Sequence, residues 1–583
     1  GVDDYVVGSR YHLPILSPLD DDGVLTEEAG PFAGMKTDDA NKAICQHMEE
    51  SGALLKLSFF KHQYPHCWRC GTPTLFRATN QWFASIDGFR EKALDEIENN
   101  IKFTPEWGKE RLYNMIRDRG DWCISRQRVW GVPIPVFYCE DCGETILDDD
   151  TIASVQKHVR EHGTNCWFAM SADELLPESY KCPNCGGTHF RKETDIMDVW
   201  FDSGSTWSAV CRERPELTYP VDMYMEGADQ FRGWFQSSLL TSVATQGQAP
   251  YREVLCHGWV VDEKGKQMHK SAGNGVEPSE IIRDYGADIV RLWVASSDYT
   301  VDVRAGKEIF RQLSEAYRKM RNTARFMLGN IGDFNPAMDM VAEDQLFEID
   351  RWALKSCNSL TANVRAAYDN YDFSRAYHAI YNFCVIDMSN FYMDVIKDRL
   401  YCADEHARRC AQTALYRILV DFTKLVAPIL CFTAQEIWSY IPKLEGMQEY
   451  VCWERMPEAK SDEDAAFDAK WAKIIAVRDD VKKVLEQARA DKTIGSSLEA
   501  AVTLYCSDEM YDFLNAIPMD ELADLMIVSH VDLVKGEGGV RGLTEGLGMS
   551  VAHAAGNKCL RCWKFDTAVG EDGLCPRCAK VLG

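Results

Sequence analysis

The sequence predicts an α/β core, followed by an α-helical bundle and a small metal-bound tail. Between Asp195 and Asp302, short β-like runs alternate with helix signals, a pattern typical of a parallel sheet with crossover helices. From Lys307 to Tyr440, apolar residues recur at three- and four-residue spacing, which indicates long packed helices. Closely spaced cysteine pairs near the C-terminal end indicate a metal-bound module.

Individual elements follow from the same patterns. An early helix is predicted near Asp38–Ser51, and Val254–Val261 is expected to form one buried strand beside a helix at Asp288–Ala295. Asp468–Ala490 is typical of a charged amphipathic helix. Residues 500–548 indicate a small α/β unit before the tail.

Composition excludes several classes of protein. The 583 residues are 46% hydrophobic and 26% charged, unlike a disordered or fibrous chain. The most apolar stretch, Ala414–Trp438, is interrupted by Arg417, Asp421 and Lys424, so we expect no membrane span. We find no secretory signal. The chain starts at Gly1 without a linker before its first strand-like run, so we expect a fragment of a longer protein.

The net charge of −26 argues against a protein that coats DNA, although a local basic face still allows contact with nucleic acid. Ten of the 22 cysteines form five C-x2-C pairs and the others are scattered. Because a secreted disulfide scaffold is shorter and denser in cysteine, the sequence favours a reducing, cytoplasmic location.

Two sets of cysteine pairs predict zinc. Cys559, Cys562, Cys575 and Cys578 form C-x2-C-x12-C-x2-C, a spacing that can complete a tetrahedral Zn²⁺ shell, with free or redox-active thiols as the alternative. Cys139/Cys142 and Cys182/Cys185 are 39 residues apart and predict a second site. Cys67/Cys70 either shares a third site with residues outside this sequence or is a pair of thiols in a turn.

The loop Gly265–Asn274, GKQMHKSAGN, follows a strand-like run. Lys270 at its tip could stabilise a polyphosphate, and a solvated turn is the alternative. Residues 66–135 mix Trp and Arg, which suits either stacking on nucleotides or buried Trp beside extended Arg.

The loop resembles the KMSKS loop of class I aminoacyl-tRNA synthetases. Three further stretches, WCISRQRVWGVPIP (Trp122–Pro135), DVWFDSG (Asp198–Gly204) and EGADQFRGWF (Glu226–Phe235), resemble isoleucyl-tRNA synthetase rather than its valyl or leucyl relatives. The similarity spans nearly the whole chain and includes the four-cysteine tail. It implies the second half of a Rossmann-like class I synthetase catalytic core, a zinc-binding insertion, a helical anticodon-binding domain and a C-terminal zinc ribbon.

The expected boundaries are 1–65 for an editing-domain remnant, 66–135 for a connection to the core, 136–190 for the zinc insertion and 191–330 for the second half of the catalytic domain. The helical domain is expected at 331–499, a small α/β junction at 500–548 and the zinc ribbon at 549–583.

The resemblance implies a monomer that uses ATP with Mg²⁺ to activate L-isoleucine and transfers it to tRNA(Ile), with hydrolytic editing of mischarged valine. A valine or leucine enzyme, or a non-catalytic zinc-containing tRNA-binding protein, are the alternatives. The family's HIGH sequence is absent from this chain, so we expect the fragment alone not to activate isoleucine.

The resemblance also implies roles for particular residues. Residues expected to hold the adenylate are Glu226, Gly227, Asp229 and Gln230; Trp200 and Trp234 would accommodate the isoleucine side chain, and His257 would face the nucleotide. In the loop, Met268, His269, Lys270 and Ser271 occupy catalytic positions, with Lys270 on the ATP phosphates. Asp4 would be an editing residue that anchors an amino group.

The loop departs from the family pattern at two positions, where Gln267 replaces a lysine and His269 a serine. We hypothesise that Lys266 supplies the missing charge. Two basic features suit RNA. Lys558–Lys580 carries five basic and three acidic side chains around Trp563. Arg318, Arg321 and Arg325 would share one helix face, either against tRNA or as a solvated stripe.

Overall fold

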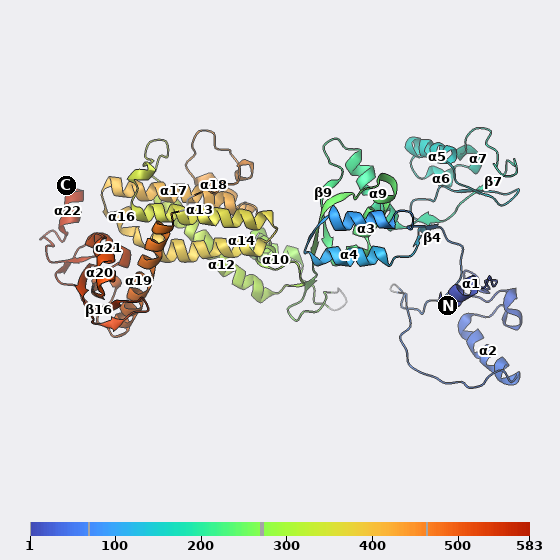
Figure 1. Ribbon diagram of the computed structural model, residues 1–583, viewed down its shortest axis with the longest axis horizontal. Helices are drawn as coiled ribbons and strands as arrows, with labels where there is room; N and C mark the ends of the chain where they lie inside the picture. The colour runs from blue at the N-terminus through green and yellow to red at the C-terminus, as the bar shows by residue number, and fades with distance from the viewer. Residues whose placement is uncertain (1, 68–69, 269–272, 462–463) are drawn as a thin grey trace. The chain divides into compact units, whose positions relative to one another are not determined.

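The computed structural model describes residues 2–67, 70–268, 273–461 and 464–583 (Figure 1). The chain divides into two compact units, Gly1–Cys256 and His257–Gly583. The segment 191–330, expected from the sequence to form one part, is therefore divided between both units. The reason is that Ile289, Leu292 and Phe310 bury their side chains in the core of the second unit.

The first unit contains a three-stranded sheet in the order β2 (Lys102–Thr104), β10 (Tyr251–His257) and β9 (Val221–Gly227). Strand β10 runs parallel to β2. Its core also contains residues from α3 (Arg90–Asn99) and α4 (Trp107–Arg117).

Helix α9 (Trp234–Gln246) lies between β9 and β10 in the chain, after the 3-10 helix η3 (Ala228–Arg232). Its residues from Phe235 to Val243 are all buried, and it ends at Gly247 with a φ of 71°, a left-handed cap that favours glycine. It packs against α8 (Val199–Gly204). A π-helical turn, η2 (Trp207–Arg212), follows α8.

The segment around the first cysteine pairs has a small core of its own, formed by residues such as Phe137, Trp167 and Leu175. An antiparallel sheet has the strand order β6-β5-β7. In it, residues at the first cysteine pair lie beside residues that follow the second pair. The elements are β5 (Phe137–Cys139), β6 (Thr145–Ile146), α5 (Asp149–His162), α6 (Cys166–Ala169), α7 (Ala172–Leu175) and β7 (Phe190–Lys192).

Two short strand pairs lie outside this segment, β1 (Phe83–Ala84) with β3 (Trp122–Cys123) and β4 (Ser125–Arg126) with β8 (Ile196–Met197). At the N-terminal side, α1 (Val2–Arg10) and the 3-10 helix η1 (Glu27–Phe32) precede α2 (Thr37–Glu50), which confirms the early helix. Among the described residues up to 65, Ala40 is the one buried hydrophobic side chain.

The second unit begins with β11 (Val260–Val261), which pairs in parallel with β12 (Val303–Arg304). The single strand expected at Val254–Val261 is wrong, because the chain breaks into β10 and β11 around Gly258. A Cβ at position 258 would lie 2.3 Å from the carbonyl oxygen of Val301, so the backbone approaches another segment too closely for a regular strand.

Helices dominate the next part, as the sequence periodicity predicts. They are α10 (Pro278–Tyr285), α11 (Ala287–Ser296), α12 (Lys307–Asn330), α13 (Glu348–Asp369), α14 (Phe373–Asn382), the π-helix η6 (Phe383–Tyr392), α15 (Met393–Val395), α16 (Lys397–Cys402), α17 (Glu405–Val426), α18 (Cys431–Tyr440) and α19 (Ala465–Ala490). Short 3-10 turns, η5 (Glu343–Gln345) and η7 (Val451–Trp453), lie between them.

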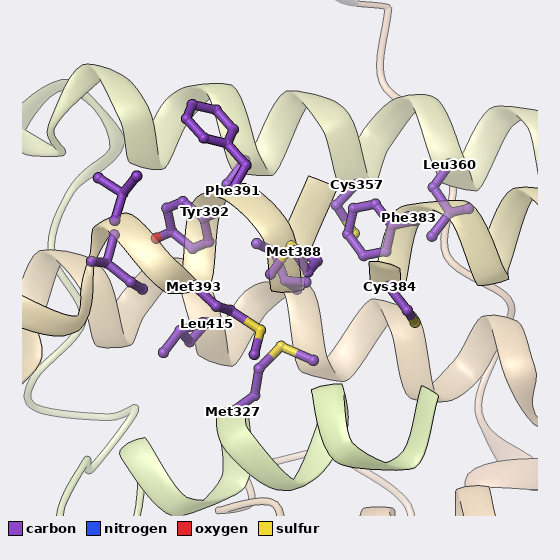
Figure 2. Close-up of a cluster of buried hydrophobic side chains, with 14 of the residues drawn as sticks. Met327, Cys357, Leu360, Phe383, Cys384, Met388, Phe391, Tyr392, Met393 and Leu415 are labelled. Atoms are coloured by element: carbon purple, nitrogen blue, oxygen red, sulfur yellow. The ribbon is translucent and has the colours of Figure 1, made fainter. Parts of the chain in front are cut away.

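The centre of this bundle is apolar and rich in sulfur. Figure 2 shows Met327 of α12 and Met393 of α15 pointing toward each other, with Leu415 of α17 beside them. In η6, Phe383 and Met388 are both buried, and their five-residue spacing matches the wider turn of a π-helix.

The C-terminal part contains a four-stranded sheet in the order β14-β13-β16-β15. Because β16 continues to His553, this sheet extends beyond the boundary expected at 548. The elements are η8 (Ser497–Glu499), β13 (Ala500–Cys506), α20 (Asp508–Asn515), α21 (Met519–Met526), β14 (His530–Lys535), β15 (Val540–Arg541), β16 (Leu547–His553), β17 (Asn557–Lys558), β18 (Phe565–Asp566) and α22 (Pro576–Leu582). No helix in the described part of the chain has the length and apolar character that crossing a bilayer requires.

Candidate functional site

The C-terminal end of β9 presents two carboxylates. Glu226, the second-to-last residue of β9, is exposed, and its Oε1 accepts a hydrogen bond from the Gly227 N–H at 2.9 Å. Asp229 follows in η3. Burial raises the pKa of the Cys256 thiol in the adjacent strand β10 to about 11, and the carboxylates of Asp229 and Glu226 add to that shift. This strand end can therefore bind a ligand group that carries a positive charge or hydrogen-bond donors.

Gln230 connects the strand end to α9. Its Nε2 donates to Asp229 Oδ2 at 3.1 Å, and its Oε1 accepts from the Trp234 N–H at 2.9 Å. The side-chain amide thus satisfies a backbone donor in the first turn of α9, as a capping residue does. All four residues expected to hold the adenylate lie in the continuous segment that runs from the end of β9 into η3: Glu226, Gly227, Asp229 and Gln230.

Trp234 is held from two sides. Its indole stacks on Tyr224 of β9, with ring centroids 3.9 Å apart and the ring planes at 14°. Its Nε1 donates to the Ser203 carbonyl oxygen at 3.0 Å and lies 3.3 Å from Thr206 Oγ1. Because the indole N–H is bonded to the α8 region, the orientation of the ring is fixed.

Trp200 lies on α8 and is 39% exposed. A Cβ at Gly233 would lie 2.9 Å from carbons of the Trp200 ring and 2.5 Å from Gln230 Oε1. The Trp200 ring therefore packs directly against the residue that precedes Trp234. The structure brings together the two tryptophans expected to form the side-chain pocket, and an apolar surface of this kind suits a branched aliphatic group.

The two aspartates of the DVWFDSG stretch, Asp198 and Asp202, are not among the site residues that the sequence predicts. Asp198 is buried, accepts the Trp122 indole N–H at 3.0 Å and forms an ion pair with Arg126 at 2.9 Å. It also caps α8 by accepting from the Trp200 N–H at 3.3 Å, so it positions Trp200. Burial, together with the Asp198 charge, raises the pKa of Asp202 to about 6.

The sequence does contain a signal for the capping role of Asp198. An aspartate directly before a short helix is typical of an N-cap, and Asp198 precedes α8. Its partners Trp122 and Arg126 lie more than 70 residues away in the chain, so only the folded structure identifies them.

His257 ends β10, and its Nδ1 lies 2.9 Å from the Gly258 carbonyl oxygen. In the loop, Met268 is half-buried and packs against the core of the second unit. The expected loop residues His269, Lys270 and Ser271 lie outside the described residues.

Asp262 holds the base of this loop. Its Oδ1 accepts from the Lys264 and Lys266 N–H groups at 2.9 and 2.8 Å, and its Oδ2 accepts from Asn274 Nδ2 at 2.9 Å. The hydrogen bond from Asn274 is the largest contribution that lowers the pKa of Asp262. Lys266 is exposed at the start of the loop, so its ammonium is accessible to solvent.

Four cysteines converge in the insertion of the first unit. The Sγ atoms of Cys139, Cys142, Cys182 and Cys185 all lie within 4.8 Å of one another. The Cys139–Cys185 and Cys142–Cys182 pairs are 3.6 and 3.7 Å apart. Tetrahedral zinc with Zn–S bonds of about 2.3 Å requires sulfur atoms about 3.8 Å apart, so this donor set fits zinc.

The second cluster lies in the tail. The Sγ atoms of Cys559, Cys562, Cys575 and Cys578 also lie within 4.8 Å of one another, and all four residues are buried. Cys562 and Cys575 are 3.8 Å apart, which again matches zinc. Both clusters therefore support zinc binding.

The cysteine-rich tail forms hydrogen bonds with α16 of the helical bundle. Arg577 forms two hydrogen bonds to Asp398 at 2.5 and 2.7 Å, and Arg561 donates to the Cys402 carbonyl oxygen at 3.0 Å.

Two expected sites remain incomplete. Cys67 and Cys70 lie in a turn closed by the Gly71 N–H on the Cys67 carbonyl oxygen at 2.8 Å. Within the described ranges, no group of three or more metal-ligand side chains includes either cysteine. Asp4 is exposed on α1. The third metal site and the editing role of Asp4 stay predictions.

Family models match most of the chain. Residues 27–306 match "tRNA synthetases class I (I, L, M and V)", residues 350–504 match "Anticodon-binding domain of tRNA ligase" and residues 556–581 match "Zinc finger found in FPG and IleRS". The chain belongs to the class I aminoacyl-tRNA synthetases. The matched zinc finger coincides with the second cysteine cluster, and the anticodon-binding match lies within the helical and small α/β parts of this synthetase chain.

Curated proteins with high sequence identity to this chain are isoleucine–tRNA ligases. Isoleucine–tRNA ligase of Moorella thermoacetica is 53% identical, and that of Desulfitobacterium hafniense strain DSM 10664 is 52% identical, each over 595 aligned residues. Both alignments cover 100% of this synthetase chain and 64% of the relative. The chain therefore spans less than two thirds of the length of the curated relatives it matches.

Among solved structures, Mycobacterium tuberculosis methionyl-tRNA synthetase in complex with methionyl-adenylate aligns with a TM-score of 0.48 and 17% identity. That alignment covers 69% of this chain and 72% of the other. The family assignment rests on the sequence relatives and the family models.

Proposed function

We propose that the chain is part of an isoleucine–tRNA ligase. In this proposal the whole protein activates isoleucine with ATP, transfers it to tRNA(Ile) and hydrolyses mischarged valine. The observation that carries the proposal is the arrangement of Glu226, Trp200 and Trp234 around the C-terminal end of β9, in a chain 53% identical to a curated isoleucine–tRNA ligase.

In this proposal, the two indoles form an apolar surface for the branched isoleucine side chain. Glu226 and the Asp229–Gln230 turn bind polar groups of the aminoacyl-adenylate. The activation reaction is the attack of the isoleucine carboxylate on the α-phosphate of ATP, which depends on alignment and on neutralisation of charge. Lys270, supported by Lys266, would contribute that charge beside Met268, His269 and Ser271, and His257 would face the nucleotide.

The cofactors and partners follow from the same proposal. Each of the two cysteine clusters would hold one structural zinc ion, and Mg²⁺ would bind with ATP. A third zinc ion would need ligands from beyond this sequence to complete Cys67 and Cys70. Asp4 would act in editing. We propose that the protein is a monomer. We also propose that it is cytoplasmic, because the 22 cysteines are all free thiols and a reducing compartment preserves them.

The test is amino-acid-dependent pyrophosphate exchange with two proteins. The first protein is this chain, for which we expect no exchange. The second is a longer protein that also contains the part of the curated relatives that this chain does not cover. For the longer protein we expect exchange with isoleucine well above that with valine or leucine. A preference for valine or leucine would replace the substrate. No exchange with any of the three would favour the non-catalytic tRNA-binding alternative.

A further inference from the structure

A cavity of about 470 Å³ lies in the first unit, where the end of α4 meets η3 and the start of α9. The volume falls in the range of about 300–1,000 Å³ that is typical of ligand-binding pockets. Glu226, Trp200 and Trp234 do not line it, so the cavity is separate from the proposed isoleucine site. The lining residues are Asn114, Met115, Asp118, Arg119, Arg232 and Gln236.

Arg119, which follows α4, is held in place from two sides. Its Nη1 donates to Gln236 Oε1 at 2.6 Å, and its guanidinium carbon lies 5.6 Å from the centre of the Trp122 ring. Gln236 and Trp122 are both buried, with 3% and 7% of their surface exposed. Two buried partners therefore fix the guanidinium group before any ligand binds, which lowers the entropic cost of binding.

The positive charge of Arg119 is incompletely compensated. Its Nε is buried and has no hydrogen-bond partner among the residues that the structure describes. Burial lowers the pKa of Arg119, and the Asp198 charge offsets only part of that shift. A negative charge in the adjacent cavity would therefore stabilise this guanidinium group.

Arg232, the last residue of η3, is exposed and supplies a second cation. Within the described ranges, neither Arg119 nor Arg232 forms an ion pair, and Arg232 has no hydrogen-bond or ring partner either. The carboxylate among the lining residues, Asp118, is already bound by Arg117 through two hydrogen bonds of 2.8 Å. It therefore neutralises neither of the two cations that line the cavity.

The other polar groups of the lining also favour an anion. Asn114 adds a side-chain amide, and Gln236 lies in the first turn of α9, where the helix dipole contributes partial positive charge. Guanidinium groups bind phosphate oxygens through paired, charge-assisted hydrogen bonds. A phosphate presents more oxygen acceptors than a carboxylate, so it can contact both arginines at once. Such a local cationic site attracts an anion even on a chain with a net charge of −26.

We propose that this cavity binds a phosphate group, with Arg119 and Arg232 as its cationic ligands and Asn114 as a further donor. The source is either free inorganic phosphate or the phosphate of a mononucleotide, because both offer the same oxygens. The site is independent of the proposed function, since it uses none of the residues assigned to isoleucine or to the adenylate.

The experiment titrates inorganic phosphate into the 583-residue chain by isothermal titration calorimetry, with sodium chloride adjusted to keep the ionic strength constant. We expect one saturable site. Arg232→Gln should weaken phosphate binding about tenfold or more, because it removes charge-assisted hydrogen bonds. Arg232→Lys keeps the charge but loses the planar fork, so its affinity should lie between those of the parent and Arg232→Gln.

The matched control is Arg252→Gln on β10. It removes the same charge from an exposed arginine of the same unit, which pairs with Asp222 at 2.9 Å, and it should leave phosphate binding unchanged. Equal weakening by Arg232→Gln and Arg252→Gln would indicate non-specific attraction and would overturn the inference. The test uses Arg232 because its side chain is exposed, whereas Arg119 packs against Trp122 and its loss also affects the fold.

Further titrations distinguish the sources. Uridine 5′-monophosphate that binds more tightly than inorganic phosphate, and loses affinity in Arg232→Gln, would assign the site to a nucleotide phosphate. Equal or weaker binding of the nucleotide would assign it to the free ion. Acetate that binds as tightly as phosphate would overturn the choice of phosphate, and no saturable binding of either phosphate compound would overturn the inference as a whole.

The same titration on the longer protein, which contains the part of the curated relatives that this chain does not cover, is the final test. We expect phosphate binding there to depend on Arg232 as it does in the shorter chain. Loss of that binding in the longer protein would mean that the additional part occupies the cavity, and would overturn the inference.

Discussion

The indole of Trp234 lies almost parallel to the phenol ring of Tyr224, with 3.9 Å between ring centroids. Tyr224 belongs to β9 and Trp234 begins α9, so the stack closes the turn that carries Glu226 and Gln230. Stacked aromatic pairs contribute about 0.5–1.5 kcal/mol beyond the area they bury. The same contact that stabilises the turn therefore also orients one wall of the proposed isoleucine pocket.

Gly233 should tolerate no side chain. In Gly233→Ala, the new methyl group would lie 2.9 Å from the Trp200 ring and 2.5 Å from Gln230 Oε1, so Trp200 must move. We expect a loss of about 1–3 kcal/mol in the free energy of unfolding, measured by chemical denaturation, and a changed tryptophan fluorescence spectrum.

The control for this substitution is Gly120→Ala, where a Cβ would meet no atom within 4 Å. Equal stability of the two variants would contradict the packing of Trp200 on Gly233.

Asp202 should make stability depend on pH. Its folded pKa is about 6 against an ordinary 3.8, so ionisation is less favourable in the folded state, and stability falls as pH rises from about 4 to about 6. Asp202→Asn should therefore stabilise the protein at pH 7 by about 1 kcal/mol, because Asp202 is only half-buried and solvent screening reduces the free energy well below the about 1.4 kcal/mol that one pKa unit would give in full. Below pH 4 the difference should vanish.

Thermal unfolding between pH 3.5 and 8 checks this expectation. Asp198→Asn, which removes the neighbouring negative charge, should shift the Asp202 titration to lower pH when followed by carboxyl NMR. A stability difference that is constant over this pH range would contradict the role of Asp202.

Zinc should be bound at two independent sites. We expect elemental analysis to find two zinc ions for each chain, falling to one in Cys139→Ser and to one in Cys559→Ser. Because the tail is too small for a large core, metal loss there should unfold it, which limited proteolysis detects. Cys452→Ser, at an exposed cysteine outside both clusters, serves as the control. Three ions in the parent chain would point to a site at Cys67 and Cys70.

The ion pair between Asp350 and Arg399 should be far more sensitive than a surface pair. Asp350 is fully buried, accepts two hydrogen bonds from Arg399 at 3.1 and 2.6 Å and one from the Tyr392 hydroxyl at 2.7 Å. Arg399→Met leaves the carboxylate buried without its cation, which costs about 3–5 kcal/mol.

Arg408→Met breaks the half-exposed pair with Asp333 and should cost less than about 1 kcal/mol. Urea unfolding of both variants measures the difference. Similar losses of stability in the two would refute the distinction between buried and surface pairs here.

Local sequence determined much of the architecture. The helical periodicity from Lys307 to Tyr440 gives helices in the structure, because an apolar stripe at this spacing can be buried only on one face of a helix. Four of the five C-x2-C pairs converge into two clusters as predicted, since each turn directs two thiols to the same side. The DVWFDSG and EGADQFRGWF stretches pointed to the residues that gather at the end of β9.

Tertiary structure decided what spacing does not encode. Asp198 contacts Trp122 and Arg126, and Trp200 packs against Gly233. Each contact joins residues that are distant in the chain, so no local periodicity reveals it. The break at Gly258 depends on a close contact with Val301, and the burial of α11 and α12 places the boundary between compact units at Cys256 rather than at residue 330. Arg318 of α12 forms an ion pair with Glu315 at 3.2 Å, and that pairing likewise depends on side-chain positions that residue types leave undetermined.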